Sequence, residues 1–138
     1  MYFKTILFLS IGSAVFWTCK KDPGQGGNSF IRGKVYAKYY NKTFTAVLDS
    51  GYAPNVGVYI IYGNDVTYGD NQNTNYDGTY EFRYLRTGDY KIYAYSKDST
   101  GAYNGKVNLL APPIAVIANV TIKSANQTVN VANLQVVK

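Results

Sequence analysis

The chain has 138 residues, enough for one small domain, and a single cysteine, so it cannot form an internal disulfide. Its 14 Lys and Arg residues outnumber 8 Asp and Glu residues, for a formal net charge of +6, but they are scattered rather than clustered as on a nucleic-acid-binding surface. The absence of histidine excludes catalytic triads and metal centres built on imidazole. We therefore expect no nucleic-acid partner, cofactor or metal. We also expect no enzyme, because most carboxylates lie in turn-like segments.

The first region has a positive charge near its start and an uncharged apolar run at 6–17, followed closely by Cys19. A helix of that length is about 18 Å long, too short for a hydrocarbon core of about 30 Å, and the pattern is typical of a secretory signal. The sequence FWTC, at 16–19, resembles the lipobox of bacterial lipoproteins. The resemblance implies that 1–18 is a signal peptide and that Cys19 carries lipids that bind a membrane. Since Lys20 follows, it also implies an outer-membrane location. An ordinary secretory signal with an unmodified thiol is the alternative.

The next segment, 19–29, includes the glycine-rich sequence PGQGGNS. It has no large apolar residue and no periodicity, which predicts a flexible tether. The folded domain is therefore expected at 30–138.

The remaining sequence is typical of an all-β domain, because it is rich in tyrosine and almost without helix signals. The segment 56–62 is apolar on both faces, which predicts a central strand. Pro112 and Pro113 exclude a central strand throughout 107–116. Alternation and turn signals predict about seven strands, in a single antiparallel β-sandwich. The expected segments are 30–38, 43–48, 56–62, 79–84, 90–96, 118–123 and 128–137.

Four motifs then occur in order: IRGKV at 31–35, APNVGVYI at 53–60, NYDGTYEF at 75–82 and LRTGDYKI at 85–92. Together they resemble carboxypeptidase regulatory-like domains, over roughly 30–96. The resemblance implies a transthyretin-like β-sandwich. Its hairpin should point five side chains inward: Tyr80, Phe82, Leu85, Tyr90 and Ile92.

The candidate functional residues are four tyrosines. If the alternation holds, Tyr36, Tyr59, Tyr93 and Tyr95 project from the face opposite the core. Exposed tyrosines can stack on sugar rings or form a protein interface, although they also serve β propensity or pack beneath an insertion. We expect a non-catalytic lipoprotein that acts as an accessory or protein-binding module at the cell envelope, with an envelope protein as partner. A carbohydrate-binding lipoprotein that uses these tyrosines is the alternative.

Overall fold

The computed structural model of the chain describes residues 21–101, 107 and 110–138. The expected signal peptide at 1–18 and Cys19 lie outside the described residues. Within them there is no helix, so none that could cross a membrane, and there are nine strands. The strands are β1 (Gln25–Tyr40), β2 (Val47–Tyr52), β3 (Gly57–Tyr62), β4 (Asp70–Asn73), β5 (Thr79–Leu85), β6 (Gly88–Ser96), β7 (Ile114–Ile122), β8 (Thr128–Asn130) and β9 (Leu134–Val137).

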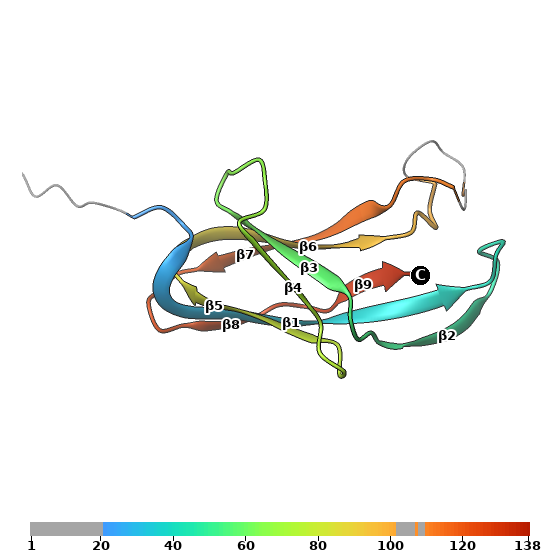
Figure 1. The fold of residues 1–138 in the computed structure, drawn as a ribbon, viewed down its shortest axis with the longest axis horizontal. Coiled ribbons are helices and arrows are strands. Elements are labelled where there is room, and N and C mark those ends of the chain that lie inside the picture. Colours follow the sequence, from blue (N-terminus) through green and yellow to red (C-terminus); the bar gives the residue numbers. More distant parts are fainter. Residues whose placement is uncertain (1–20, 102–106, 108–109) are drawn as a thin grey trace, which may run out of the picture.

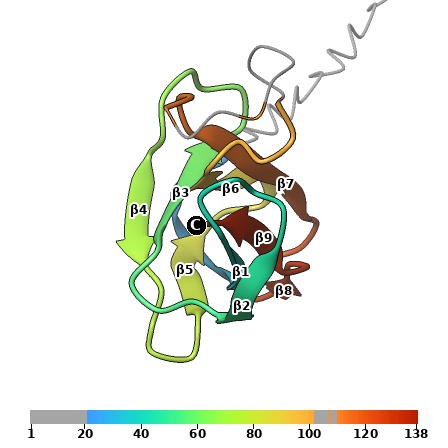
Figure 2. The same ribbon diagram turned by 90° about the vertical axis from the view of Figure 1, so that its right-hand side faces the viewer.

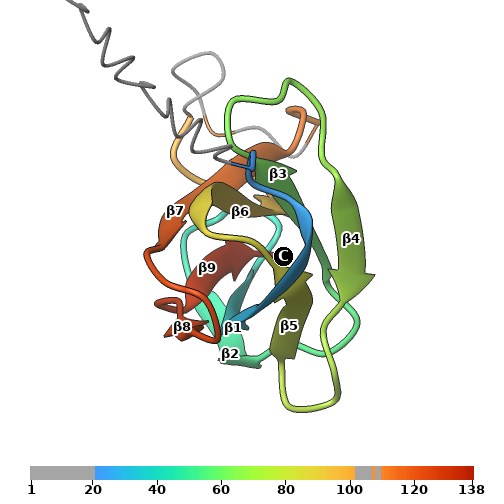
Figure 3. The ribbon, with the colours of Figure 1, turned by 90° about the vertical axis from the view of Figure 1, so that its left-hand side faces the viewer.

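The strands form two sheets that pack face to face (Figures 1–3). One sheet is built around the long strand β1, which pairs antiparallel with β5 and then with β2, and parallel with β8 and β9. The other sheet has the order β4-β3-β6-β7 and is antiparallel throughout. The predicted all-β sandwich is confirmed. The expectation of a purely antiparallel arrangement is wrong for β8 and β9, because both return alongside β1 in its own direction.

The core lies between the sheets and is made by alternate residues of each strand. Ile31 and Val35 of β1 face Ile60 of β3 and Ile92 of β6, and all four side chains are fully buried. Burial of each such side chain contributes about 1.5–3 kcal/mol. The five residues expected to point inward from the hairpin, Tyr80, Phe82, Leu85, Tyr90 and Ile92, are all buried.

The glycine-rich segment before residue 30 differs from the expected tether. Strand β1 already begins at Gln25, and the Gly24 amide donates to Tyr90 Oη at 3.0 Å. A Cβ at Gly27 would lie 2.1 Å from the Leu85 carbonyl oxygen, and Ser29 is fully buried. The glycines therefore allow the backbone to approach its neighbours closely at one end of the sandwich. This segment is part of the folded domain rather than a flexible linker.

Other strands also differ from the sequence prediction: β7 (Ile114–Ile122) begins before the expected segment 118–123, and the expected segment 128–137 is divided into β8 and β9. Strand β4 lies outside all of the expected strand segments. Its four residues are all polar, so its sequence gives no strand signal, and pairing with β3 orders it. Strand β2 continues to Tyr52, beyond the expected segment 43–48, since it pairs with β1 up to Tyr36.

Candidate functional site

The candidate site lies on the outer face of the sheet β4-β3-β6-β7. Tyr59 of β3 and Tyr93 of β6 are direct cross-strand partners, and Tyr95 follows two residues along β6. Their neighbours Val58, Ile60 and Ala94 are buried in the core, so strand alternation places the three tyrosines on the opposite face. The expected outward direction of these three residues agrees with the structure.

The rings contact one another. The Tyr59 and Tyr93 rings are stacked, with centroids 5.1 Å apart and planes 16° apart. Tyr95 meets both edge-on, at 5.7 Å from Tyr59 and 5.6 Å from Tyr93. Edge-to-face and offset-stacked pairs each contribute about 0.5–1.5 kcal/mol beyond their buried area. The cluster is therefore held in place by its own contacts.

A fourth ring, Tyr68, joins the cluster from the loop before β4. Its centroid is 5.1 Å from that of Tyr59, and the Gly69 amide donates to the Ile60 carbonyl at 2.8 Å, which holds the loop against β3. We call Tyr59, Tyr68, Tyr93 and Tyr95 the tyrosine patch. Sequence reasoning missed Tyr68 because loop residues have no periodicity, and its only signal was an aromatic residue within a polar segment.

The fourth predicted tyrosine, Tyr36, is not part of this patch. It lies on β1 in the other sheet, where its ring meets Tyr52 edge-on at 5.5 Å. Its hydroxyl is 3.0 Å from Ser50 Oγ. Tyr36 thus packs along the β1–β2 hairpin, which agrees with the interpretation that some of these tyrosines serve local sheet packing.

The surroundings of the patch are apolar on one side and polar on the other. Ile117 of β7 pairs with Tyr93 and is 56% exposed, and Ala115 pairs with Tyr95. Lys91 and Asn71 are exposed neighbours on the same face. An apolar centre with a polar border is the usual anatomy of a binding surface.

Tyr93, a member of the patch, has a perturbed hydroxyl. Burial raises the pKa of Tyr93 above its ordinary value of about 10, and the neighbouring hydroxyls of Tyr95, Tyr59 and Tyr68 add to the shift. Tyr93 therefore keeps its proton near pH 7. It can donate and accept hydrogen bonds and bury ring surface.

No metal site accompanies the patch. Among the residues that the structure describes, no group of three or more Asp, Glu, His or Cys side chains could hold a metal ion.

The comparisons with solved structures include two distant neighbours. No family model matches the chain, and no curated protein matches it. A major pilin subunit of Bacillus cereus, BcpA, is 18% identical over 77% of this chain and 29% of its own length, with a TM-score of 0.40. A candidate carbohydrate-binding protein of Pseudomonas aeruginosa is 17% identical over 79% of this chain and 90% of its own, also with a TM-score of 0.40. These values give no basis for transferring either protein's function. The β-sandwich implied by the resemblance to carboxypeptidase regulatory-like domains is present, whereas membership of that family stays a prediction.

Proposed function

We propose that this chain is a non-catalytic binding module of the bacterial cell envelope that holds a protein partner on its tyrosine patch. The observation that carries the proposal is the contact of four tyrosine rings on one outer sheet face. The regular β-sandwich does not require this arrangement, because the core is complete without these rings.

Ring orientation favours a protein over a sugar. Tyr59 and Tyr93 cover one face of each other, and Tyr59 has two further ring neighbours. A sugar stacks on a free ring face, whereas a protein interface also uses ring edges and hydroxyls. Rigid aromatic residues with their tips at the surface are enriched at binding hot spots, since few rotamers are lost on binding.

The anchor and location are part of the proposal. The sequence at 16–19 supports lipidation of Cys19, and Lys20 supports an outer-membrane address. Several acyl chains at one residue would give a stable membrane attachment. Mass spectrometry of the mature protein tests this step, with a diacylated or triacylated Cys19 at the N-terminus as the expected result. A mature chain that starts elsewhere with a free thiol would refute it.

Site-specific crosslinking in intact cells tests the partner. The photoreactive residue p-benzoylphenylalanine would replace Tyr68, Tyr95 or, as a control, Tyr76, which is 91% exposed on the turn between β4 and β5. We expect one discrete protein adduct at positions 68 and 95 and none at 76. The adduct should disappear when Ile117→Lys places a charge beside the patch.

Other outcomes count against the protein partner. Identical adducts at all three positions would indicate random encounters. Neutral glycans that bind the full chain, and that lose binding in Tyr95→Ala but not in Tyr76→Ala, would replace the protein partner with a carbohydrate.

A further inference from the structure

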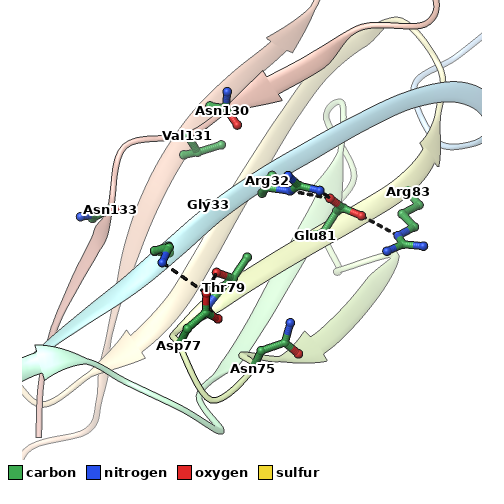
Figure 4. A pocket seen from close by; sticks show the side chains of 11 residues that line it. Arg32, Gly33, Asn75, Asp77, Thr79, Glu81, Arg83, Asn130, Val131 and Asn133 are labelled. Atoms are coloured by element: carbon green, nitrogen blue, oxygen red, sulfur yellow. Dashed lines mark hydrogen bonds and ion pairs between the residues drawn. The ribbon is translucent and has the colours of Figure 1, made fainter.

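A second, chemically different surface lies on the opposite side of the sandwich. A groove of about 570 Å³ crosses the outer face of the β1–β5 pair and reaches the strand β8 (Figure 4). Most of the residues that line it are polar or charged, and Val131 is the one with an apolar side chain. The groove contains no tyrosine of the patch.

Glu81 of β5 organises the centre of this groove. Arg83 Nε donates to Glu81 Oε1 at 2.6 Å, and Arg32 Nε donates to Glu81 Oε2 at 2.5 Å. Figure 4 shows the two arginines on either side of the one carboxylate. The Glu81 side chain is 14% exposed, whereas those of Arg32 and Arg83 are 55% and 62% exposed. Glu81 thus holds two solvent-facing guanidinium groups in fixed positions.

The arginines keep unused donors. A guanidinium has five N–H groups in a planar fork, which matches a carboxylate. Within the described part of the chain, Arg83 donates only through Nε, and Arg32 has one terminal nitrogen without a partner. Because their positions are already fixed, an incoming anion would lose less side-chain entropy on binding.

The charge balance of the lining favours an anion. Three cationic residues, Arg32, Lys34 and Arg83, face two carboxylates, Asp77 and Glu81, so the groove has a net charge of 3 − 2 = +1. Both carboxylates are satisfied within the protein. Asp77 accepts from the Thr79 hydroxyl at 2.8 Å and from Lys34 at 3.3 Å.

The carboxylates also stay ionised. Hydrogen bonds from Thr79, first from its side chain and then from its backbone, lower the pKa of Asp77. Burial raises the pKa of Glu81, but the hydrogen bonds and charges of both arginines together lower it below its ordinary value. The unused hydrogen-bond donors of the groove can therefore bind a ligand that carries negatively charged acceptor groups.

Neutral amides flank these charges. Asn130 and Asn133 line the side toward β8 and β9, and Asn75 lies near the turn before β5 (Figure 4). Amide groups donate and accept together, as hydroxyl groups of a sugar require. A peptide strand could not add to the sheet here, because β1 is already paired with β5 on one side and β8 on the other.

We propose that this groove binds an acidic polysaccharide, with a uronic acid carboxylate against Arg83 and Arg32 and the sugar hydroxyls against the asparagines. This site is separate from the tyrosine patch.

Fluorescence anisotropy with a labelled oligogalacturonate tests the proposal on the full chain. Arg83→Gln should weaken binding about tenfold or more, since a charge-assisted hydrogen bond contributes about 1.5–3 kcal/mol. Lys123→Gln, which removes the same charge from an exposed turn, should change binding less than about twofold. Asn130→Ala leaves the charge unchanged and should weaken binding about threefold. A carboxyl-reduced oligomer of the same length should fail to compete.

Three results would overturn the proposal. Equal losses in Arg83→Gln and Lys123→Gln would reduce the effect to general charge attraction. Competition by polyglutamate as strong as by the unlabelled oligogalacturonate would assign the groove to acidic peptides. Absence of binding at millimolar oligosaccharide would refute the proposed site. Tyr95→Ala should leave oligogalacturonate binding intact, so this proposal and the tyrosine patch fail or succeed separately.

Discussion

The two outer faces of the sandwich use the same backbone geometry for opposite chemistry. Tyr59 and Tyr93 are direct cross-strand partners on one face, and Arg32 and Glu81 are direct cross-strand partners on the other. The first pair joins its strands through stacked neutral rings, and the second through an ion pair. The inward neighbours on both sheets are the same kind of buried aliphatic residue, such as Ile60 and Ile31.

This comparison indicates that the inward residues determine the fold and leave the outward residues free for binding. An aromatic pair buries apolar area and does not depend on salt. An exposed ion pair contributes little to stability, because solvent screens it and long side chains lose entropy. The aromatic face should therefore stabilise the protein as well as bind, whereas the charged face should mainly bind.

The largest difference in stability between the two sheets should come from matched glycine substitutions. A Cβ at Gly33 of β1 would lie 2.3 Å from the buried Tyr80 Oη, whereas one at Gly57 of β3 would lie 3.3 Å from Tyr59 Oη. Overpacking a core costs about 1–3 kcal/mol. We expect Gly33→Ala to lower the free energy of unfolding by about 3 kcal/mol and Gly57→Ala by less than about 1 kcal/mol. Urea unfolding of the full chain measures both.

Removal of the Tyr80 hydroxyl provides the control. The loss in Gly33→Ala should be smaller in a Tyr80→Phe background, because the closest atom is gone. Equal losses for the two glycine variants would mean that the sheet shifts to accept the methyl group.

The second prediction compares two buried hydroxyls, one from each sheet. Tyr90 Oη accepts from the Gly24 amide at 3.0 Å and donates to the Arg86 carbonyl at 2.7 Å. Tyr80 Oη is buried, and no hydrogen-bond partner lies near it among the described residues. Tyr90→Phe should lower the free energy of unfolding by about 1–3 kcal/mol, since it leaves a buried donor unpaired. Tyr80→Phe should leave it unchanged or raise it, and a comparable loss in both variants would contradict the assigned hydrogen bonds.

Much of the fold could be predicted from the sequence, because alternation identifies inward residues directly. The central position of β3 followed from the hydrophobic pattern, and the inward direction of the hairpin residues from Tyr80 to Ile92 followed from alternation together with the family resemblance. The glycine-rich segment could not be placed this way, since glycine permits both flexibility and close packing. Gly26, expected in a tether, has φ +101° and lies against the Arg86 guanidinium. Only the partner segment, which is distant in sequence, decides between these roles.

The candidate site was predictable only where it lies on strands. Period-two alternation gave the outward direction of Tyr59, Tyr93 and Tyr95, but the register of β3 against β6 determined which rings meet. Tyr68 comes from a loop, and Tyr36 faces outward on the other sheet. The arginine pair around Glu81 was also missed, because scattered charges in the sequence gather only when β1 pairs with β5.

The third prediction measures the aromatic face by a double-mutant cycle. Tyr59→Leu and Tyr93→Leu, alone and together, should give a coupling energy of about 0.5–1.5 kcal/mol. The value should be equal at low and high NaCl, because the rings are neutral. A cycle between Tyr59 and Tyr36, which lie on different sheets, serves as the control and should give no coupling. A coupling for Tyr59 and Tyr93 that falls with salt would show that the pair is not held by ring contact.

The smallest effect should come from the charged face, through a cycle of Arg83→Gln and Glu81→Gln. At pH 7 and low salt we expect a coupling of about 0.2–1 kcal/mol, because both arginine partners of Glu81 are exposed.

The same ion pair should depend on pH. The pKa of Glu81 is lowered in the folded protein, because the two arginines outweigh the opposing effect of burial. The ion pair therefore stabilises the fold fully above the ordinary glutamate pKa of about 4.3, and this contribution is lost as the pH falls through the lower folded value. Urea unfolding of the four proteins of the cycle at pH 7 and pH 2.5, with and without 0.5 M NaCl, distinguishes an electrostatic coupling from one due to side-chain packing. A coupling that persisted at pH 2.5 would have to come from packing of the long side chains, and the chemical contrast between the two faces would then no longer explain their stability.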